Sequence, residues 1–318
     1  MNENLLELLA CPACGSANLE IHSEDILACP SCAARYPILN GIPHMLPAHL
    51  AATLHQKNAY TERLMAAMRQ GKDLRDPGNP ELDRFMWEHH LYNWAKEVIY
   101  KDSRAAEIFS SYSEHGARVL CEFLRAKAKG VRGKRLLYVG SGNDYLVSLP
   151  LEQAGAFIVN LDLVSDSLED LRWAGAQNCV CGDARQLPFR TEAFDVVFSK
   201  GSLHHSQPIA EPLRAMARVV KRGGHIVVAE PSKYMRLPRF LLPAGLAHPT
   251  PYENALSSRE VVRILVKEGV NQFHLTALTH APPGTPAPLA RLWERLGHVL
   301  PWLFDRFAFE FILHGRKA

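Results

Sequence analysis

Residues 135–143 read RLLYVGSGN, a short apolar run followed directly by a turn that contains two glycines. Nucleotide-binding α/β proteins pass from their first strand to the next helix through such a turn. Glycine at positions 140 and 142 lets the backbone approach a ligand at the carboxyl end of the strand. Because GxG occurs in many turns, the weight of this motif depends on the segments that follow it.

Four further apolar segments follow, separated by helical stretches. The sequence predicts these strands over residues 157–161, 178–181, 194–198 and 225–229. Strands that alternate with helices at this pitch predict a parallel sheet with helices on both faces. The second strand ends in Asp162, about twenty residues beyond the glycines, where an acid can accept hydrogen bonds from both hydroxyls of a ribose.

Five stretches in this order carry a family resemblance: LLYVGSGND, NLDL, GDARQLPF, FDVVFSKGSLHH and RVVKRGGHIVVAEP. Together they resemble the class I S-adenosylmethionine-dependent methyltransferases of type 11, over about residues 131–275. The resemblance implies a doubly wound, Rossmann-like α/β fold with a seven-stranded sheet whose last strand is antiparallel. It places the final helix at 257–269, the sixth strand at 273–278 and the seventh at 307–315.

The same resemblance assigns cofactor-binding residues by position. It implies that the methionine part of S-adenosylmethionine contacts Gly140, Ser141 and Gly142, the ribose Asp162 with the adjacent Leu163, and the adenine Asp183 with Ala184, while Ser199 and Lys200 close the site. The ligand has no phosphate, so the helix N-terminus meets the methionine carboxylate instead.

Two residues depart from the family pattern. Tyr138 stands where the family has an acid, two residues before the first glycine, and Asp144 stands where the family has a third glycine. Asp144 is therefore a candidate for the contact to the methionine amino group. If nothing compensates for the two changes, the chain is a non-catalytic descendant that binds the cofactor weakly.

His204 and His205 follow the fourth strand, on the side where a methyl acceptor is expected. An imidazole has the unperturbed pKa that suits a general base at neutral pH. Both residues are candidate catalytic bases, with His204 placed first. The alternative is that the pair caps the next helix or packs under the cofactor.

Four cysteines near the N-terminus form two CxxC pairs, Cys11 with Cys14 and Cys29 with Cys32. Each pair can present two thiolates from one tight turn, and two such pairs complete a tetrahedral zinc site. Residues 18–22 and 25–28 read as a hairpin that returns the second pair to the first. So small a unit depends on the metal for much of its folding free energy.

With the stretch ARYPILNGIPHMLP at 34–47, the cysteine pairs resemble the small zinc-ribbon proteins that activate tRNA and translation-factor methyltransferases, and their free-standing bacterial relatives. The resemblance implies a docking and stabilising module, here fused to its methyltransferase. We therefore predict three parts: a zinc ribbon at 1–47, a helical linker and substrate cap at 48–130, and the methyltransferase domain at 131–318.

The helical middle carries two notable runs. Aromatic and histidine side chains crowd residues 85–94, which indicates a helix core or a cap over the substrate, with His89 or His90 as weaker candidates for a base. Basic residues concentrate between Arg125 and Arg135, which indicates a solvated helix end or a site for an anionic partner. Two further segments, at 231–251 and 279–306, are expected near the substrate.

The overall composition and charge exclude few classes of function. The net charge is +3, too small to imply a nucleic-acid partner without local concentration, and residues 1–47 hold one basic side chain against five acids. No signal peptide or bilayer-spanning run is evident, so we expect a cytoplasmic protein. The sequence does not indicate an oligomeric state.

We expect transfer of a methyl group to an oxygen or nitrogen of a small organic acceptor, such as a natural product, sugar or lipid-like intermediate, because the two segments near the substrate are apolar enough to enclose one. An RNA or protein methyltransferase with the ribbon as docking module is the first alternative. A non-catalytic cofactor-binding scaffold is the second. Nucleic acid is not the expected partner.

Overall fold

The computed structural model describes residues 2–47, 50, 114, 116–126, 130–232, 256–278, 288–289, 292, 295–296, 299–304 and 310–318. Several expectations fall outside these residues: most of the helical linker and cap predicted at 48–130, with the aromatic run at 85–94, nearly all of the segment at 231–251 and more than half of the segment at 279–306. The last part of the predicted helical linker is described, and residues 116–126 are helical.

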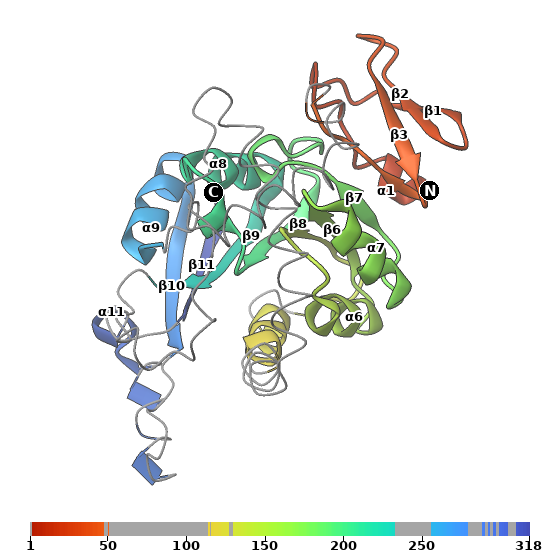
Figure 1. Cartoon of the computed structure of the whole chain (residues 1–318). Helices are drawn as coiled ribbons and strands as arrows, with labels where there is room; N and C mark the ends of the chain where they lie inside the picture. The colour runs from red at the N-terminus through yellow and green to blue at the C-terminus, as the bar shows by residue number, and fades with distance from the viewer. Residues whose placement is uncertain are drawn as a thin grey trace, which may run out of the picture.

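A seven-stranded sheet forms the centre of the molecule, with the order β10-β11-β9-β8-β5-β6-β7 (Figure 1). Its strands are β5 (Arg135–Val139), β6 (Phe157–Asp162), β7 (Cys179–Cys181), β8 (Phe194–Lys200), β9 (Val220–Pro231), β10 (Val270–Leu278) and β11 (Glu310–Lys317). β11 pairs antiparallel with β9 and β10, whereas the β5, β6, β7, β8 and β9 neighbours pair in parallel. The predicted doubly wound sheet with an antiparallel last strand is confirmed.

The fifth strand of the prediction starts earlier than expected. β9 begins at Val220, before the expected start at residue 225, and includes the Gly223-Gly224 pair. Gly223 has a φ of +73°, and the register between β8 and β9 shifts between Phe194 and Val196. The glycines therefore form an irregularity inside the pairing, because an extra stretch of chain is absorbed without ending the strand.

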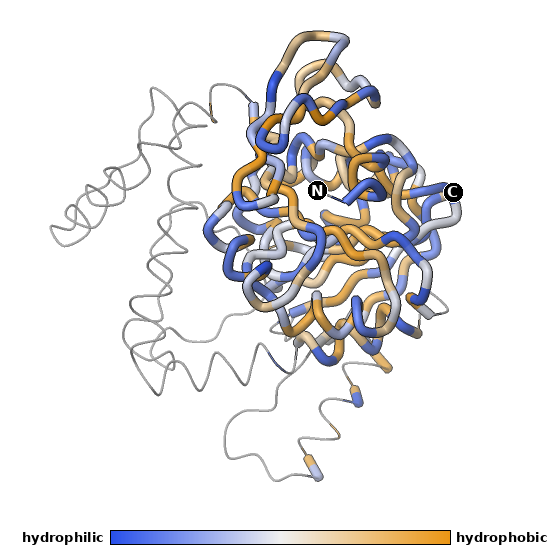
Figure 2. The backbone as a smooth tube through the Cα atoms, turned by 90° about the vertical axis from the view of Figure 1, so that its right-hand side faces the viewer, coloured by the Kyte–Doolittle hydropathy of each residue, from blue (hydrophilic) through white to orange (hydrophobic). Residues whose placement is uncertain are grey.

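Helices cover both faces of the sheet. They are α6 (Tyr145–Gln153), α7 (Ser165–Trp173), α8 (Ala210–Val219), α9 (Ser258–Lys267) and the short α11 (Pro301–Phe304). Alternate residues of each strand enter different clusters: Leu136 and Tyr138 pack with residues 116–126 and α6, whereas Leu137 and Val139 pack with α8 and α9. Figure 2 shows hydrophobic stretches of backbone in the interior of the described part of the molecule, as expected for a parallel sheet buried on both faces.

The N-terminal unit is a four-stranded antiparallel sheet preceded by α1 (Glu3–Leu6). Its strands are β1 (Glu20–Ser23), β2 (Ile26–Ala28), β3 (Arg35–Leu39) and β4 (Ile42–Pro43). Asn40 and Gly41, between β3 and β4, have φ angles of 49° and 73°. Two successive positive φ angles characterise the type I′ hairpin turn, for which Asn-Gly is the preferred sequence.

This small sheet packs against the β7 edge of the large one (Figure 1). The amide of Met45 donates to the carbonyl of Cys181 at 2.7 Å, and the amide of Ala10 donates to the carbonyl of Pro188 at 2.9 Å. Leu8, Leu9 and Met45 belong to the same buried cluster as Val180 and Phe189. The N-terminal unit therefore covers the edge strand and shares its hydrophobic core with the large sheet.

Among the residues that the structure describes, no helix has the length and hydropathy that crossing a bilayer requires.

Candidate functional site

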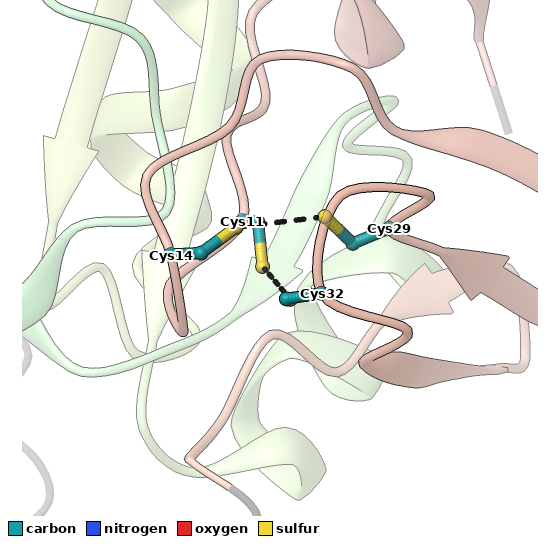
Figure 3. Close-up of side chains that lie close together, drawn as sticks. All are labelled: Cys11, Cys14, Cys29 and Cys32. Atoms are coloured by element: carbon teal, nitrogen blue, oxygen red, sulfur yellow. Dashed lines mark hydrogen bonds between the residues drawn. The ribbon is translucent and has the colours of Figure 1, made fainter.

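The four paired cysteines converge in the N-terminal unit, and their sulfur atoms all lie within 4.8 Å of one another (Figure 3). Cys11 Sγ is 3.6 Å from Cys32 Sγ, and Cys14 Sγ is 3.6 Å from Cys29 Sγ. With a Zn–S bond of about 2.3 Å, the edge of a tetrahedral ZnS₄ site measures about 3.8 Å. The donor set and its spacing therefore fit zinc.

The surroundings of the cysteines favour metal-bound thiolates. Cys11 and Cys29 are buried, and the Tyr36 hydroxyl lies 3.1 Å from Cys11 Sγ, where it can donate to a thiolate. A hydrogen bond to a ligand of this kind orients it and moderates its charge. The remaining cysteines, Cys121, Cys179 and Cys181, are buried and lie outside the cluster.

The glycine turn after β5 is held by the end of β6. The amides of Gly140 and Ser141 both donate to the carbonyl of Leu161, at 2.8 and 3.0 Å. The amide of Gly142 donates to Asp162 Oδ2 at 2.7 Å. The two strand ends are thus fastened together, with an acid at their junction.

Gly140 is required at the tightest point of this turn. It has a φ of +66°, and a Cβ at this position would lie 2.1 Å from Ser202 Oγ and 2.4 Å from Ser202 Cβ. Gly142 also has a positive φ of +51°, but a Cβ there would meet no atom within 4 Å. Steric exclusion therefore acts at Gly140, where the loop that follows β8 crosses over the turn.

A pocket opens at the carboxyl ends of β5, β6 and β7. Its lining residues are Gly140, Leu161, Asp162, Leu163, Gly182, Asp183, Ala184, Ser202, His205 and Ser206. Ligands of doubly wound sheets bind at this edge, beside the first strand. An acid, a glycine turn and a histidine thus face one cavity.

The carboxylate of Asp162 is held in a fixed orientation. Its Oδ1 accepts from the amide of Val164 at 2.8 Å, and its Oδ2 accepts from the amide of Gly142 at 2.7 Å. Burial raises the pKa of Asp162, and the two amides offset part of that rise because they favour the charged form. Each oxygen can accept a second hydrogen bond, so the fixed carboxylate can bind a pair of hydroxyls.

The carboxylate of Asp183 makes more contacts within the protein than the carboxylate of Asp162 does. Its carboxylate accepts from the amide of Arg185 at 2.8 Å and forms an ion pair with the Arg185 guanidinium, with Nη2 2.7 Å from Oδ2. The side chain also begins η3 (Ala184–Gln186) as its N-cap. Asp183 thus shapes the loop after β7, and Ala184 follows it at the pocket wall.

Two family models match the chain. Residues 137–228 match the model described as "Methyltransferase domain", and residues 2–41 match the model described as "Trm112p-like protein". The chain joins a Trm112p-like domain to a methyltransferase domain.

Curated relatives match only part of this chain. The biotin biosynthesis bifunctional protein BioHC of Cellvibrio japonicus is 28% identical over 136 residues, which cover 42% of this chain and 27% of the relative. The demethylmenaquinone methyltransferase of Streptomyces avermitilis is 38% identical over 111 residues, which cover 33% of this chain and 46% of the relative. The chain thus spans less than half the length of either relative.

The fold has a counterpart in a solved complex between the Haloferax volcanii Trm112 methyltransferase activator and a methyltransferase. The match covers 72% of this chain and 97% of the solved one, with a TM-score of 0.51 and 16% identity. At this identity the likeness concerns the fold alone.

Only some of the residues that we predicted to bind the cofactor line this pocket. Gly140, Asp162, Leu163, Asp183 and Ala184 line it, whereas Ser141, Gly142, Asp144, Ser199 and Lys200 do not. Ser141 is buried in the turn, and Gly142 supplies the amide that Asp162 accepts. Ser199 is buried and bonds to Glu230 and Ser202.

The two predicted histidines take different positions in η4 (Leu203–His205). His205 lines the pocket of the methyltransferase domain, whereas His204 is 5% exposed and its Nδ1 lies 2.8 Å from Glu230 Oε2. The two rings are in contact, with centroids 4.0 Å apart.

Glu230 has no counterpart in the sequence-based prediction. It lies at the end of β9 and is fully buried, and its Oε1 accepts from Ser199 Oγ, the amide of Ser202 and the amide of Leu203 at 2.9–3.1 Å. One carboxylate therefore shapes the whole turn after β8. A charged residue directly after the apolar run HIVVA was the available signal, because buried carboxylates are rare and need partners.

Proposed function

We propose that the chain transfers a methyl group from S-adenosylmethionine to an oxygen or nitrogen of a small organic acceptor. The observation that carries the proposal is the pocket at the ends of β5, β6 and β7, where Gly140, Asp162 and Ala184 meet His205. The match to the methyltransferase domain over residues 137–228 supports it. The kind of acceptor belongs to the proposal, because the match covers less than half of each of these two curated relatives.

The pocket residues have separate roles in this proposal. Asp162, fixed by two amides, accepts hydrogen bonds from the ribose hydroxyls, with Leu163 beside it. Asp183 holds the loop in which Ala184 contacts the adenine. The turn at Gly140 admits the methionine part because no side chain fills that space.

The bound cofactor supplies an electrophilic methyl group on a sulfonium. The protein's main contribution is then alignment and exclusion of water, since positive charge disappears during the transfer. His205 accepts the proton of an acceptor hydroxyl or ammonium from its place in the pocket wall. The His204 ring packs against the His205 ring, and the Glu230 carboxylate contacts His204 Nδ1 and keeps the His204 ring in place.

Two observations favour a small acceptor over RNA. The N-terminal unit has one basic residue against five acids, whereas a module that grips phosphates should be positive. Its inner surface is also used for packing on β7 and on the loop that follows. The similarity to a demethylmenaquinone methyltransferase agrees with a small organic substrate.

We also propose that the four-cysteine cluster holds one structural zinc ion, and that the protein is cytoplasmic. None of the seven cysteines forms a disulfide, which supports a reducing compartment. The second candidate function is methylation of RNA or protein, favoured by the Trm112p-like match at residues 2–41. The third is a non-catalytic scaffold that binds the cofactor.

The deciding experiment incubates the purified chain and methyl-labelled S-adenosylmethionine with a cell extract, which is then separated into organic-soluble, RNA and protein fractions. We expect label in the organic-soluble fraction, lost with His205→Ala and kept with His22→Ala, a change at an exposed ribbon position. Label confined to RNA or protein would replace the first proposal by the second. Cofactor binding without any transfer would favour the scaffold.

A further inference from the structure

The segment between β10 and β11 carries a concentration of exposed apolar side chains, which we call the apolar stripe. Its residues are between 44% and 73% exposed, and they are Leu289, Leu292, Val299, Leu300 and Trp302. They make up half of the ten large hydrophobic residues that are exposed in the described part of the chain. Single exposed leucines are ordinary on a protein surface, but five large apolar residues within fourteen positions mark a site of contact.

The first residues of the stripe share one face of a helix. The described residues from Leu289 to Val299 are helical, and the amide of Leu300 donates to the carbonyl of Leu296 at 2.8 Å. Leu289, Leu292, Leu296 and Val299 follow one another at intervals of three or four residues, which places them along one side of the helix. The stripe is therefore a row of apolar side chains, and α11 extends it with a tryptophan.

The stripe is attached to the edge of the large sheet at which the pocket opens. β10 ends at Leu278 and β11 begins at Glu310, and these two residues are paired. Glu310 also pairs with Pro231 at the end of β9, so the segment leaves and re-enters the sheet at its carboxyl edge. α11 packs against β10, and the described parts of the segment before α11 project away from the sheet in Figures 1 and 2.

The described interior of the protein does not bury the stripe. None of its residues lines the pocket of the methyltransferase domain, and none belongs to the buried clusters that the described residues form. Apolar area that remains in water lacks the free energy that burial supplies. An apolar phase outside the chain would therefore stabilise the stripe by covering it.

Basic residues accompany the stripe. Residues 288–304 contain Arg291 and Arg295 against one acid, Glu294, and Arg295 is exposed. Neither arginine falls on the spacing of the leucines, so the helical residue Arg295 lies to the side of the stripe. Helices with leucine and tryptophan on one face and arginine beside it typically lie in the surface of a bilayer, where tryptophan favours the level of the headgroups.

We propose that the apolar stripe binds the surface of a membrane that contains anionic lipid. The stripe residues enter the outer part of the acyl layer, and Arg295 lies among the lipid phosphates. A projecting helix fits a bilayer without a shaped groove on its partner, and no bilayer-spanning helix is needed. Because the stripe and the pocket share the carboxyl edge, a membrane-bound chain would take a lipid-like acceptor from the bilayer, a step that rests on the function proposed above.

The test is sedimentation of the full chain with vesicles of phosphatidylcholine, either pure or with about a quarter of phosphatidylglycerol. We expect the chain to bind the anionic vesicles more tightly than the neutral ones. Leu292→Ser combined with Val299→Ser should weaken binding to both kinds of vesicle by about tenfold or more, because two apolar side chains no longer enter the bilayer. Arg295→Gln should weaken binding to the anionic vesicles alone, by about fivefold.

Matched controls change similar side chains elsewhere on the surface. Ile21→Ser combined with Val266→Ser removes two exposed apolar residues from β1 and α9, and Arg259→Gln removes an exposed arginine from α9. Trp302→Ser should weaken vesicle binding, whereas Trp173→Ser, at a more exposed tryptophan of α7, should not. All these side chains are exposed, so the thermal midpoint of each variant should equal that of the wild type.

The inference is overturned if the wild type stays in solution with both kinds of vesicle, or if the control variants lose binding as the stripe variants do. A dimer in light scattering that dissociates in the Leu292→Ser, Val299→Ser variant, without vesicle binding, would assign the stripe to a second copy of the chain and also overturn it. Vesicle binding without methyl transfer would remove the proposed function and the acceptor class but support the membrane surface. Transfer to the organic-soluble fraction without vesicle binding would do the reverse.

Discussion

His204 Nδ1 lies 2.8 Å from Oε2 of Glu230, a carboxylate with no exposed surface. The other oxygen of Glu230 accepts from Ser199 Oγ and from two backbone amides of the turn after β8. Removal of a buried acceptor leaves its donors unsatisfied, which costs more than the bonds themselves contribute. Glu230 therefore holds the position from which His205 faces the pocket.

We predict that Glu230→Gln lowers the free energy of unfolding by about 1–3 kcal/mol, because one amide replaces a charged acceptor. Glu230→Ala should cost more, since the amides of Ser202 and Leu203 then lose their acceptor. Urea denaturation measures both. The control is Glu192→Gln, whose partner Arg222 is exposed and whose loss should change little. Equal effects of the Glu230 and Glu192 variants would show that the buried network is dispensable.

Gly140→Ala should destabilise the protein more than Gly142→Ala. Both changes place a side chain at positive φ, at a cost of about 1–2 kcal/mol. Only at Gly140 does the new Cβ collide with Ser202, which adds about 1–3 kcal/mol of overpacking. Denaturation curves give the difference, and Gly140→Ala combined with Ser202→Gly should recover part of it. No recovery in the double variant would refute the steric explanation.

The protein should contain one zinc ion per chain when it is purified without added metal, because four thiolates at tetrahedral spacing bind zinc strongly. Elemental analysis decides this. Cys29→Ser should lose the metal and lower the thermal midpoint, whereas Cys121→Ser, a buried cysteine outside the cluster, should keep it. A metal-free protein with reactive thiols at Cys11 and Cys14 would contradict the structural role.

Zinc removal should also weaken cofactor binding. The amide of Met45 bonds to the carbonyl of Cys181, and the Gln186 side chain bonds to the carbonyl of Pro12 at 2.6 Å. These contacts join the ribbon to β7 and to the loop that carries Ala184 in the pocket. Calorimetry before and after chelation tests the link, and unchanged affinity of the zinc-free chain would show that the ribbon does not support that loop.

Asp162→Ala should weaken S-adenosylhomocysteine binding by about tenfold or more, and by more than His204→Ala does, because the acid accepts two ribose hydrogen bonds. Wild-type affinity should also fall on acidification. Burial raises the pKa of Asp162, so affinity is full above that pKa and is lost as the pH falls through it. Asp162→Asn should lack this loss in calorimetry over a pH series. An identical acid decline in Asp162→Asn would assign the effect to another group.

The local patterns in the sequence were sufficient to predict the fold class and the cluster of four cysteines. The alternation of apolar strands with helices predicted the parallel sheet, and the two CxxC pairs predicted the cluster of Cys11, Cys14, Cys29 and Cys32. Both signals depend on spacing along the chain, which the residues alone define. The family resemblance assigned Asp162 and Ala184 to the cofactor, and both line the pocket at the strand ends.

The contacts between strand ends were decided by the tertiary structure. Tyr138, Asp144 and Lys200 meet because β5 and β8 are neighbours in the sheet, and Glu230 reaches His204 across 26 residues of chain because β9 pairs with β8. Such pairings depend on which strands are adjacent and on which face each side chain points to. The residues alone therefore predicted the strand pattern and the cysteine cluster, whereas the three-dimensional fold determined which charged groups share a buried site.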